Sequence, residues 1–526
     1  MNQELKNLYD KGDYYTLFYK ILELQSSKKR KQKLNKDIID ILYFKLDSLV
    51  KLNFLNDAIS EINDLLSNPN LTPISKLKLM IVEIKALIDQ GKFIQALEIA
   101  YQGDFQLRSI QTSVKDDDEK FIGRYYNSVG AIHFYRGDLE TSILFFKKAL
   151  TILENYQEIK EISDTINNMG QVYQLLGEFD LANKCYLECI SLYQSLSHER
   201  GIAISLNNLG VISLQQGNLD DAYNYFIESY GLIKKICNVT EQINRQFEIN
   251  YKSLDYIMIH FENHEFLGEL LSNLAETYAR MGNISDSLEN YTKAIYVYQK
   301  INNSVLISDL YIQLITLNLE NDNYDSSRHY LELLTKLNAS ESKVIQIRIK
   351  YAKAMFYNKE QRFKGKYEAE RIFYEIINAE KQIDWTLSVK AMTQLSELLF
   401  EEFSFFEDPK IIEEAKNIID KMHALAKNKK SFSLLTETYL IKMKFAVIDE
   451  NLETAMLYLD QAYFTSSEKN LGALINKVKI EREKLAENYQ YWKDFLKTSS
   501  IKERFEKLEI LDYMNEIKNV IIPFKD

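Results

Sequence analysis

Apolar and polar positions alternate along the chain with the period of an amphipathic helix, and the alternation itself repeats. Three segments, at positions 125–150, 166–190 and 206–230, align without gaps at a constant interval. In each segment apolar residues recur three or four positions apart on both sides of a short polar break. Each segment therefore predicts two amphipathic helices that pack against one another.

Two glycines recur at fixed places in these segments. The first is Gly130, Gly170 or Gly210, and the second is Gly137, Gly177 or Gly217. The first falls inside a predicted helix, where glycine costs about 1 kcal/mol relative to alanine, so close approach of a second helix is the expected reason for it. The second follows the end of that helix, where a left-handed C-terminal cap is needed.

The second predicted helix also carries a fixed pattern. A polar residue precedes it (Asp138, Glu178, Asn218), and small, aromatic and small residues follow (Ser142, Phe146, Ala149; Ala182, Tyr186, Cys189; Ala222, Phe226, Ser229). Aspartate and asparagine are good N-caps, and small side chains let two helices approach closely. Each unit is thus predicted to be two antiparallel helices joined by a tight turn.

Further units extend the array in both directions. A fourth runs from Asn273 to Ala294, and it begins later than the interval predicts, so a segment is inserted before it. We expect residues 239–264, which keep helical spacing, either to extend a neighbouring helix or to form half of a degenerate pair. Weaker units are marked by these positions: Leu314 with Ser327 and Leu334, Ala369 with Phe373, Leu395 to Met422, Ala455 with Leu459, Ala58 with Ile62, and Ala96 with Ala100.

This periodicity predicts an all-α protein, an α-solenoid of about ten antiparallel helix pairs with C-terminal capping helices. We divide it into 1–118 (diverged pairs), 119–238 (three clear repeats), 239–340 (the insertion and two repeats), 341–467 (diverged pairs) and 468–526 (a long charged helix and a shorter one that cap the end). The acidic loop at 116–119 is treated as a soft boundary.

The small–aromatic–small series and the glycine pair resemble the tetratricopeptide repeat, whose usual length is about 34 residues. The interval in this chain is longer, as the spacing of Gly130, Gly170 and Gly210 shows, and it is similar to that of Pins-family adaptors, kinesin light chains and Rap-type peptide receptors. The resemblance implies a right-handed superhelix whose concave face is lined by the first helix of each pair. It also implies that proteins or peptides bind to that face.

Composition narrows the possible partners. The net charge of −11 argues against nucleic acid. Neither a membrane-spanning apolar stretch nor a secretory signal is found, and three cysteines in so long a chain favour a reducing compartment, so we expect a cytoplasmic protein. The basic run at 27–33 is interpreted as a solvated loop, with targeting or anionic-surface binding as the alternative.

Candidate binding residues come from a row of carboxamides on the first helices. If the internal glycine is position eight, position six holds Asn168, Asn208, Asn273 and Gln313, and position five holds Asn127, Asn167 and Asn207. A carboxamide donates and accepts at once, so it can hold the backbone of an extended peptide. In the resembling families asparagine has that role, which we carry over to Asn168, Asn208 and Asn273, whereas Gln313 and Ser128 depart from the pattern.

Alternatives remain for these residues and for the function. The asparagines are equally compatible with tying together the backbones of adjacent helices, or with being simply tolerated at these positions. Nearby positions that would set specificity are mixed in charge: Arg124, Phe134, Tyr135, Gln171, Gln174, Glu276 and Arg280. A scaffold for extended segments is the first hypothesis, and a Rap-type peptide-sensing regulator is the alternative; a separate bundle at 1–110 would favour the latter.

Signs of catalysis are not found in the sequence. Phosphate-binding, nucleophile-elbow and metalloprotease motifs are lacking, and we expect no enzyme, cofactor or metal. Cys185 and Cys189 lie four apart, and we interpret them as packing residues. His260 and His264 share that spacing and would make half a metal site, but a partly exposed pair is the simpler interpretation.

Overall fold

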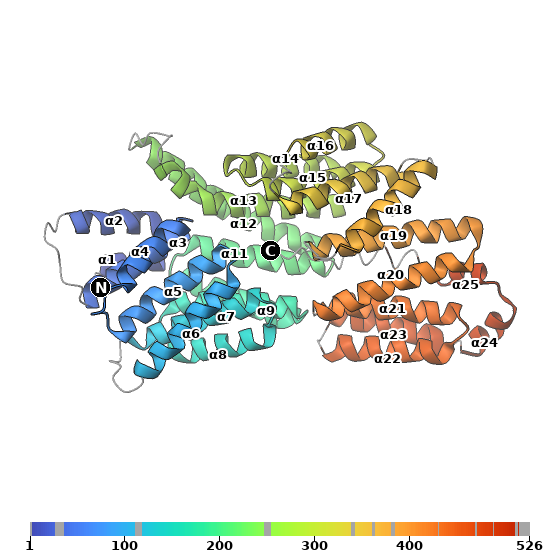
Figure 1. Cartoon of the computed structure of the whole chain (residues 1–526), viewed down its shortest axis with the longest axis horizontal. Helices are drawn as coiled ribbons and strands as arrows, with labels where there is room; N and C mark the ends of the chain where they lie inside the picture. The colour runs from blue at the N-terminus through green and yellow to red at the C-terminus, as the bar shows by residue number, and fades with distance from the viewer. Residues whose placement is uncertain are drawn as a thin grey trace. The chain divides into compact units, whose positions relative to one another are not determined.

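A computed structural model describes residues 3–26, 36–110, 118–246, 254–337, 342–359, 363–379, 384–429, 431–468, 471–487, 489–510 and 514. These residues form 25 helices and no strand (Figure 1). Within the two units described below, α1 to α12 form six successive pairs and α15 to α22 form four, where about ten pairs were expected. The basic run at 27–33, positions 116–117 of the acidic loop, and the side chains of Cys237 and His260 lie outside the described residues.

The chain divides into two compact units, one of residues 1–174 and 179–281 (unit 1) and one of 175–178 and 282–526 (unit 2). The first helices of unit 1 are α1 (Gln3–Asp10), α3 (Lys36–Lys51), α5 (Pro73–Asp89), α7 (Lys120–Tyr135), α9 (Ile159–Leu175), α11 (Glu199–Gln215) and α13 (Leu254–Arg280). The second helices are α2 (Tyr14–Ser26), α4 (Leu55–Leu66), α6 (Phe93–Ile110), α8 (Leu139–Asn155), α10 (Phe179–Ser195) and α12 (Leu219–Gln246).

Unit 2 begins with α14 (Ile284–Lys300) and continues with four pairs. They are α15 (Ser304–Glu320) with α16 (Tyr324–Lys336), α17 (Lys343–Lys359) with α18 (Phe363–Ile377), α19 (Trp385–Phe406) with α20 (Pro409–Asn428), and α21 (Phe432–Ile448) with α22 (Leu452–Glu468). Three helices follow: α23 (Gly472–Glu487), α24 (Tyr489–Thr498) and α25 (Ile501–Lys507). Handedness of the superhelix stays a prediction.

The recurrent glycines have the two roles that the pattern indicates. An added Cβ at Gly130, Gly170 or Gly210 would lie 2.6 Å from the ring of Phe146, Tyr186 or Phe226 on the second helix of the same pair. The glycines after the first helices are left-handed, with φ of +78°, +75° and +79° at Gly137, Gly177 and Gly217. The internal glycine therefore makes room for an aromatic ring, and the terminal one closes the helix.

The small residues of the second helices are also where the pattern places them. Ser142, Ala182 and Ala222 are fully buried, and Ser142 Oγ donates to the carbonyl oxygen of Gly130 at 2.8 Å. The key positions of the weaker units are buried in the same way: Ala58, Ile62, Ala96, Ala100, Ser327, Leu334, Ala369, Phe373, Ala455, Leu459 and Ala462. The helix-pair pattern thus holds over the diverged regions.

The insertion before the fourth repeat extends both neighbouring helices. Helices α12 and α13 have 28 and 27 residues, whereas α9 and α11 have 17. Of the two expected outcomes, extension is therefore the correct one. Lengthening both helices keeps the alternation of chain direction, which a single additional helix would reverse.

The N-terminal helices do not form a bundle of their own at 1–110. One continuous hydrophobic core runs from Leu5 through Leu77 and Ala96 to Val129 and Ile132, and so joins α1 to α7. Residues 1–110 therefore do not form the separate bundle that would have favoured a Rap-type regulator.

The C-terminal region differs from the two helices expected there. It contains three described helices, because Ser500 opens α25 with a capping box in which Glu503 takes part. Helix α25 returns to α21, where Arg504 donates to the carbonyl oxygen of Ile448 at 3.0 Å, and Phe505 packs on Phe400 and Phe403. The last described helix thus covers first helices of unit 2.

Candidate protein-interaction surface

The predicted carboxamides of unit 1 form a ladder between successive first helices. Position six of each repeat donates to position five of the preceding repeat: Asn168 to Asn127 at 3.3 Å, Asn208 to Asn167 at 3.2 Å, and Asn273 to Asn207 at 2.9 Å. Each contact joins the amide nitrogen of one side chain to the Oδ1 of the other. These bonds tie adjacent first helices together through side chains, whereas the alternative interpretation expected contacts to the helix backbones.

The ladder leaves hydrogen-bonding capacity at the surface. Asn127, Asn167, Asn168, Asn208 and Asn273 are half-buried, and only Asn207 is fully buried. A carboxamide has two N–H donors and an oxygen with two lone pairs, and each ladder contact uses one of them on each side. Binding of a peptide by these groups stays a prediction.

Ser128 and Gln313, which depart from the asparagine pattern, take no part in the ladder. Ser128 is buried, and its hydroxyl donates to the carbonyl oxygen of Arg124 one turn back in α7. Gln313 is half-buried on α15, which belongs to unit 2. The structure thus does not bring Gln313 and the ladder together within one unit.

A cluster of paired charges, most of them buried, was missed by the sequence analysis and lies on or next to the first helices of unit 1. Arg124 of α7 contacts Glu158 at 2.8 Å and Glu161 at 2.7 Å, and Lys160 of α9 contacts Asp164 at 2.8 Å. Asp47 of α3 contacts Lys85 of α5 at 2.6 Å. We call these seven residues the charge cluster.

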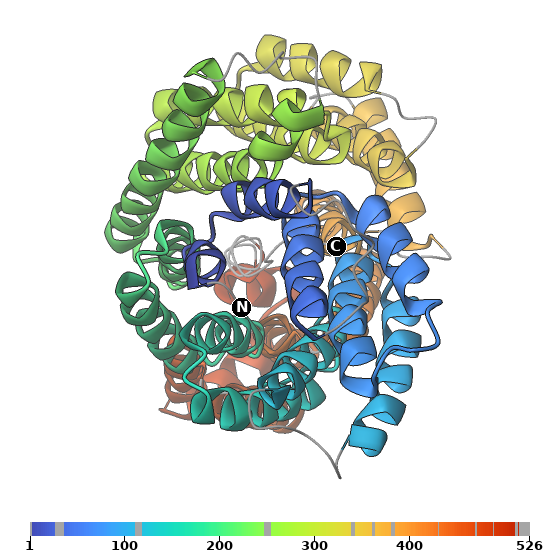
Figure 2. The same ribbon diagram turned by 90° about the vertical axis from the view of Figure 1, so that its left-hand side faces the viewer.

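The charge cluster and the N-terminal helix contact one another. The hydroxyl of Tyr9 in α1 donates to Asp47 at 3.0 Å, and Lys6 lies 3.3 Å from Glu158. The ring of Tyr9 lies 4.6 Å from Lys160 Nζ. In Figure 2 the dark blue N-terminal helices lie inside the curve of the helices coloured blue to green. Helix α1 therefore lies across several first helices of unit 1.

Burial and pairing shift the pKa values of the cluster in opposite directions. Burial disfavours ionisation of Glu158, but Arg124 and Lys6 outweigh it and lower its pKa. Burial raises the pKa of Glu161, since Arg124 offsets only part of the cost. The pKa of Arg124 is raised, because the nearby carboxylates more than compensate for its burial. One carboxylate of the pair is thus firmly ionised, and the other holds a proton more readily than usual.

The positions predicted to set specificity have mixed surroundings. Gln174 accepts a hydrogen bond from Tyr186 at 3.1 Å, and Arg280 pairs with Glu276. Tyr135 is exposed and stacks on Phe93 at 5.5 Å. Phe134 and Gln171 are half-buried. Arg124 is buried in the charge cluster instead of being exposed as a contact residue.

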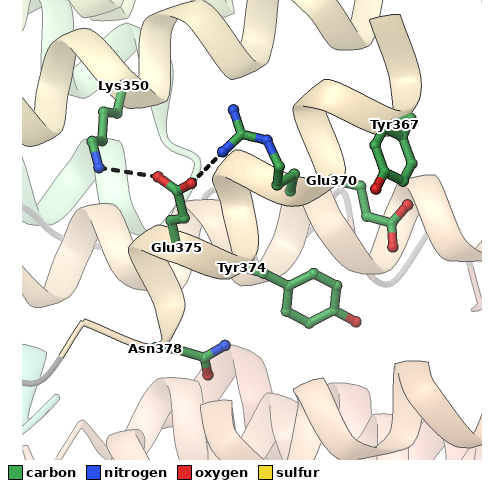
Figure 3. A pocket seen from close by; sticks show the side chains of 7 residues that line it. Lys350, Tyr367, Glu370, Tyr374, Glu375 and Asn378 are labelled. Carbon is green, nitrogen blue, oxygen red and sulfur yellow. Dashed lines mark hydrogen bonds and ion pairs between the residues drawn. The ribbon is translucent and has the colours of Figure 1, made fainter. Parts of the chain in front are cut away.

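Unit 2 contains a separate open cavity of about 750 Å³ beside α18 (Figure 3). It is lined by Lys350, Tyr367, Glu370, Arg371, Tyr374, Glu375 and Asn378. Lys350 pairs with Glu375 (Figure 3), and Arg371 pairs with both Glu375 and Glu368, so the two cations of the cavity already have carboxylate partners. We assign no ligand to it.

The cysteines and possible metal ligands considered in the sequence analysis are the remaining candidates for a reactive site. Cys189 is fully buried, as expected of a packing residue, and burial raises the pKa of its thiol. The described residues contain no group of three or more histidine, cysteine or acidic side chains that could hold a metal ion. Among the described helices, none combines the length and apolar character that a membrane span needs.

Family models match two parts of the chain. Residues 161–235 and 268–304 each match a model described as tetratricopeptide repeat. These matches include five of the six ladder residues. A comparison with curated proteins gave no match.

Several solved structures are similar at low identity. A Rap protein complexed with competence and sporulation factor is 11% identical, with 83% of this chain and 99% of that chain covered and a TM-score of 0.48. The quorum sensor NprR from B. thuringiensis is 13% identical, with coverage of 79% and 97% and a TM-score of 0.43. BtubC from P. vanneervenii is 16% identical, with coverage of 48% and 91% and a TM-score of 0.35. These identities are too low for function to be transferred.

Proposed function

The chain is a member of the tetratricopeptide repeat superfamily, and from this premise we propose that it is a non-catalytic scaffold that binds an extended segment of a partner protein. The proposed site is the row of Asn127, Asn167, Asn168, Asn208 and Asn273 on the first helices of unit 1, with Asn207 beneath it. The partner's backbone would run across α7, α9, α11 and α13. We place Gln313 outside this site, because α15 belongs to unit 2.

The ladder is the observation that supports this proposal. Repeated amides are held in one orientation by their neighbours, at 2.9–3.3 Å, before any ligand arrives. Preorganised groups lose less conformational entropy on binding than free side chains do. Their remaining donors and acceptors are uncharged, so they suit a peptide backbone better than an anion or a metal.

A photo-crosslinking experiment tests this site. A benzophenone amino acid is introduced into the full chain at Gln171, which follows the ladder on α9, and in a second protein at exposed Glu188 on α10 of the same helix pair. We expect the partner to be crosslinked from Gln171 and not from Glu188. Equal crosslinking from both positions, or from Glu188 alone, would move the site off the first helices.

Alanine substitutions in the ladder provide a second test of the proposed site. Asn168, Asn208 and Asn273 are changed to alanine together, and the fold is checked by circular dichroism. The loss of three ladder bonds costs roughly 1 kcal/mol each, so some loss of stability is expected even without a ligand. The proposal requires that a folded variant lose the crosslink at Gln171; retention at the wild-type level contradicts it.

A further inference from the structure

We propose that the charge cluster is a binding site for a partner helix that carries a lysine three residues before a tyrosine, and that α1 fills this site within the chain. The proposal rests on the proposed function, since it assigns a second partner segment and a means of regulation to the same first helices. Its central residues are Lys6 and Tyr9 on α1, and Asp47, Glu158 and Lys160 beneath them.

The contacts of α1 define what the site recognises. The ring of Tyr9 packs edge-on against Phe44 at 4.6 Å, and Lys160 Nζ covers it at the same distance. Its hydroxyl is held by Asp47, so the slot distinguishes tyrosine from phenylalanine. Lys6, one turn earlier, contacts Glu158. The site therefore combines a slot for a tyrosine, between Lys160 and Asp47, with a carboxylate, Glu158, that pairs with a lysine one turn earlier.

The surface beneath α1 is ion-paired without it. Arg124 pairs with Glu158 and Glu161, Lys160 with Asp164, and Lys85 with Asp47, and all of these residues lie outside α1. Among the described contacts, helix α1 adds the hydrogen bond of Tyr9, the ion pair of Lys6 and the packing of the Tyr9 ring on Lys160 and Arg124. Departure of α1 therefore leaves no charge of the cluster without its partner, which removes the usual penalty for opening a buried ionic surface.

The guanidinium of Arg124 is buried next to the tyrosine slot. Only 4% of Arg124 is exposed, yet its Nε and Nη1 find no hydrogen-bond acceptor among the described residues. The guanidinium lies 5.8 Å from the ring of Tyr9 and 4.9 Å from that of Phe121. The carboxylate oxygens of Glu161, one of which lies 2.7 Å from Nη2, also find no hydrogen-bond donor in the described part of the chain, so this ion pair keeps capacity that Tyr9 and Lys6 do not use.

Helix α1 is attached in a way that permits release. It has eight residues, of which only Leu5 and Tyr9 are buried, and Gly12 with φ of +73° follows it. Helix α25 of unit 2 gives a contrast, because Phe505 lies among aromatic rings and Arg504 bonds to backbone carbonyl groups. We therefore assign α25 a permanent capping role and α1 an exchangeable one.

The test uses the full chain and a fluorescent peptide with the sequence of residues 3–14. In the wild type the peptide competes with an α1 that is present at an effective concentration in the millimolar range. The Tyr9→Ala chain loses this internal competitor, so it is expected to bind the peptide at least about tenfold more tightly, as measured by fluorescence anisotropy. A peptide with phenylalanine in place of its tyrosine is expected to bind more weakly, because the bond to Asp47 is lost.

Control variants separate the site from general loosening of the protein. Lys160→Met in the Tyr9→Ala chain is expected to abolish the gain, whereas Phe505→Ala, which loosens α25, is expected not to produce it. A folded Tyr9→Ala chain that binds the peptide no better than the wild type overturns the proposal. In that case α1 is a fixed part of the core to which Leu5 and Tyr9 belong, and the ladder crosslink at Gln171 still decides the proposed function on its own.

Hydrogen exchange of the unmodified protein covers the case in which Tyr9→Ala fails to fold. Amides of α1 are expected to exchange through local opening, faster than those of α3 and α7, and to become more exposed when the peptide is added. Exchange of α1 at the rate of α3 and α7, with or without peptide, overturns the proposal. Lys6→Ala, at a side chain that is 35% exposed, is expected to accelerate the exchange of α1 alone.

Discussion

The same substitution should have opposite effects at two glycines of the α11–α12 pair. Gly210 lies inside α11, where an added Cβ would be 2.6, 2.7 and 2.9 Å from three ring carbons of Phe226. Gly231 lies inside α12, where an added Cβ meets nothing within 4 Å. We therefore expect alanine to destabilise unit 1 at Gly210 and to stabilise it at Gly231.

The magnitudes follow from the geometry. Carbon atoms pack at about 3.5–4.0 Å, so the ring of Phe226 has to move by about 1 Å to admit the new methyl group. Phe226 is fully buried, and overpacking of such a site costs about 1–3 kcal/mol. Replacing a helical glycine returns about 1 kcal/mol. The net expectation is a loss of up to about 2 kcal/mol at Gly210 and a gain of up to about 1 kcal/mol at Gly231.

Urea unfolding followed by far-ultraviolet circular dichroism measures both effects. The two tryptophans, Trp385 and Trp492, lie in unit 2, so their fluorescence serves as an internal reference for the part of the chain that is not changed. Phe226→Leu should recover part of the loss in the Gly210→Ala protein, because it frees space next to the new methyl group. Equal or higher stability of Gly210→Ala alone would refute the reasoning that close approach requires the glycine.

Three further predictions concern other sites. His198 Nδ1 accepts a hydrogen bond from the backbone N–H of Gly201, and burial lowers the pKa of His198 to about 4. The neutral imidazole therefore contributes up to about 3 kcal/mol to stability, which is complete above a pH of about 6.5 and is lost as the pH falls through about 4. His198→Asn, which keeps an N-cap acceptor, should remove this pH dependence from the urea unfolding midpoints. Arg504→Met should destabilise the C-terminal helices by roughly 2–4 kcal/mol in tryptophan-monitored unfolding, because buried carbonyl oxygens lose their donor, and an unchanged midpoint would contradict this. Alkylation mapped by mass spectrometry should be slow at Cys185 and Cys189 until urea is added, because burial raises the pKa of both thiols; rapid labelling of the folded protein would be inconsistent with their packing.

Residues whose partners come from the same repeat could be predicted from the sequence. Gly170 and Tyr186 recur at fixed positions, and the contact between them follows from the repeat alone. The row of asparagines was found in the same way. That Asn168 bonds to Asn127 was not predicted, because the bond depends on how far one repeat is rotated against the next.

The charge cluster could not be predicted, and the reason is geometric. Helix α1 contacts residues on three different first helices, and the ion pairs of Arg124 join two repeats. Asp47 lies in the last third of α3, and Arg124 lies in the first third of α7. Arg124 and Asp164 do occupy equivalent positions, each six residues before an internal glycine (Gly130 and Gly170), but this recurrence does not show which charges pair or that α1 lies on them.

The sequence by itself determined the all-helical repeat, its pairs, its turns and the positions that pack within a pair. These features depend on neighbours within a single repeat, and the same local rules apply in every repeat. Only the tertiary structure decided that the insertion lengthens α12 and α13, that α25 returns to α21, and that α1 lies on the charge cluster. Those outcomes depend on contacts between distant segments, such as Tyr9 with Asp47 and Lys6 with Glu158, whose free energy is set by burial and charge in three dimensions and is not encoded in any repeating pattern.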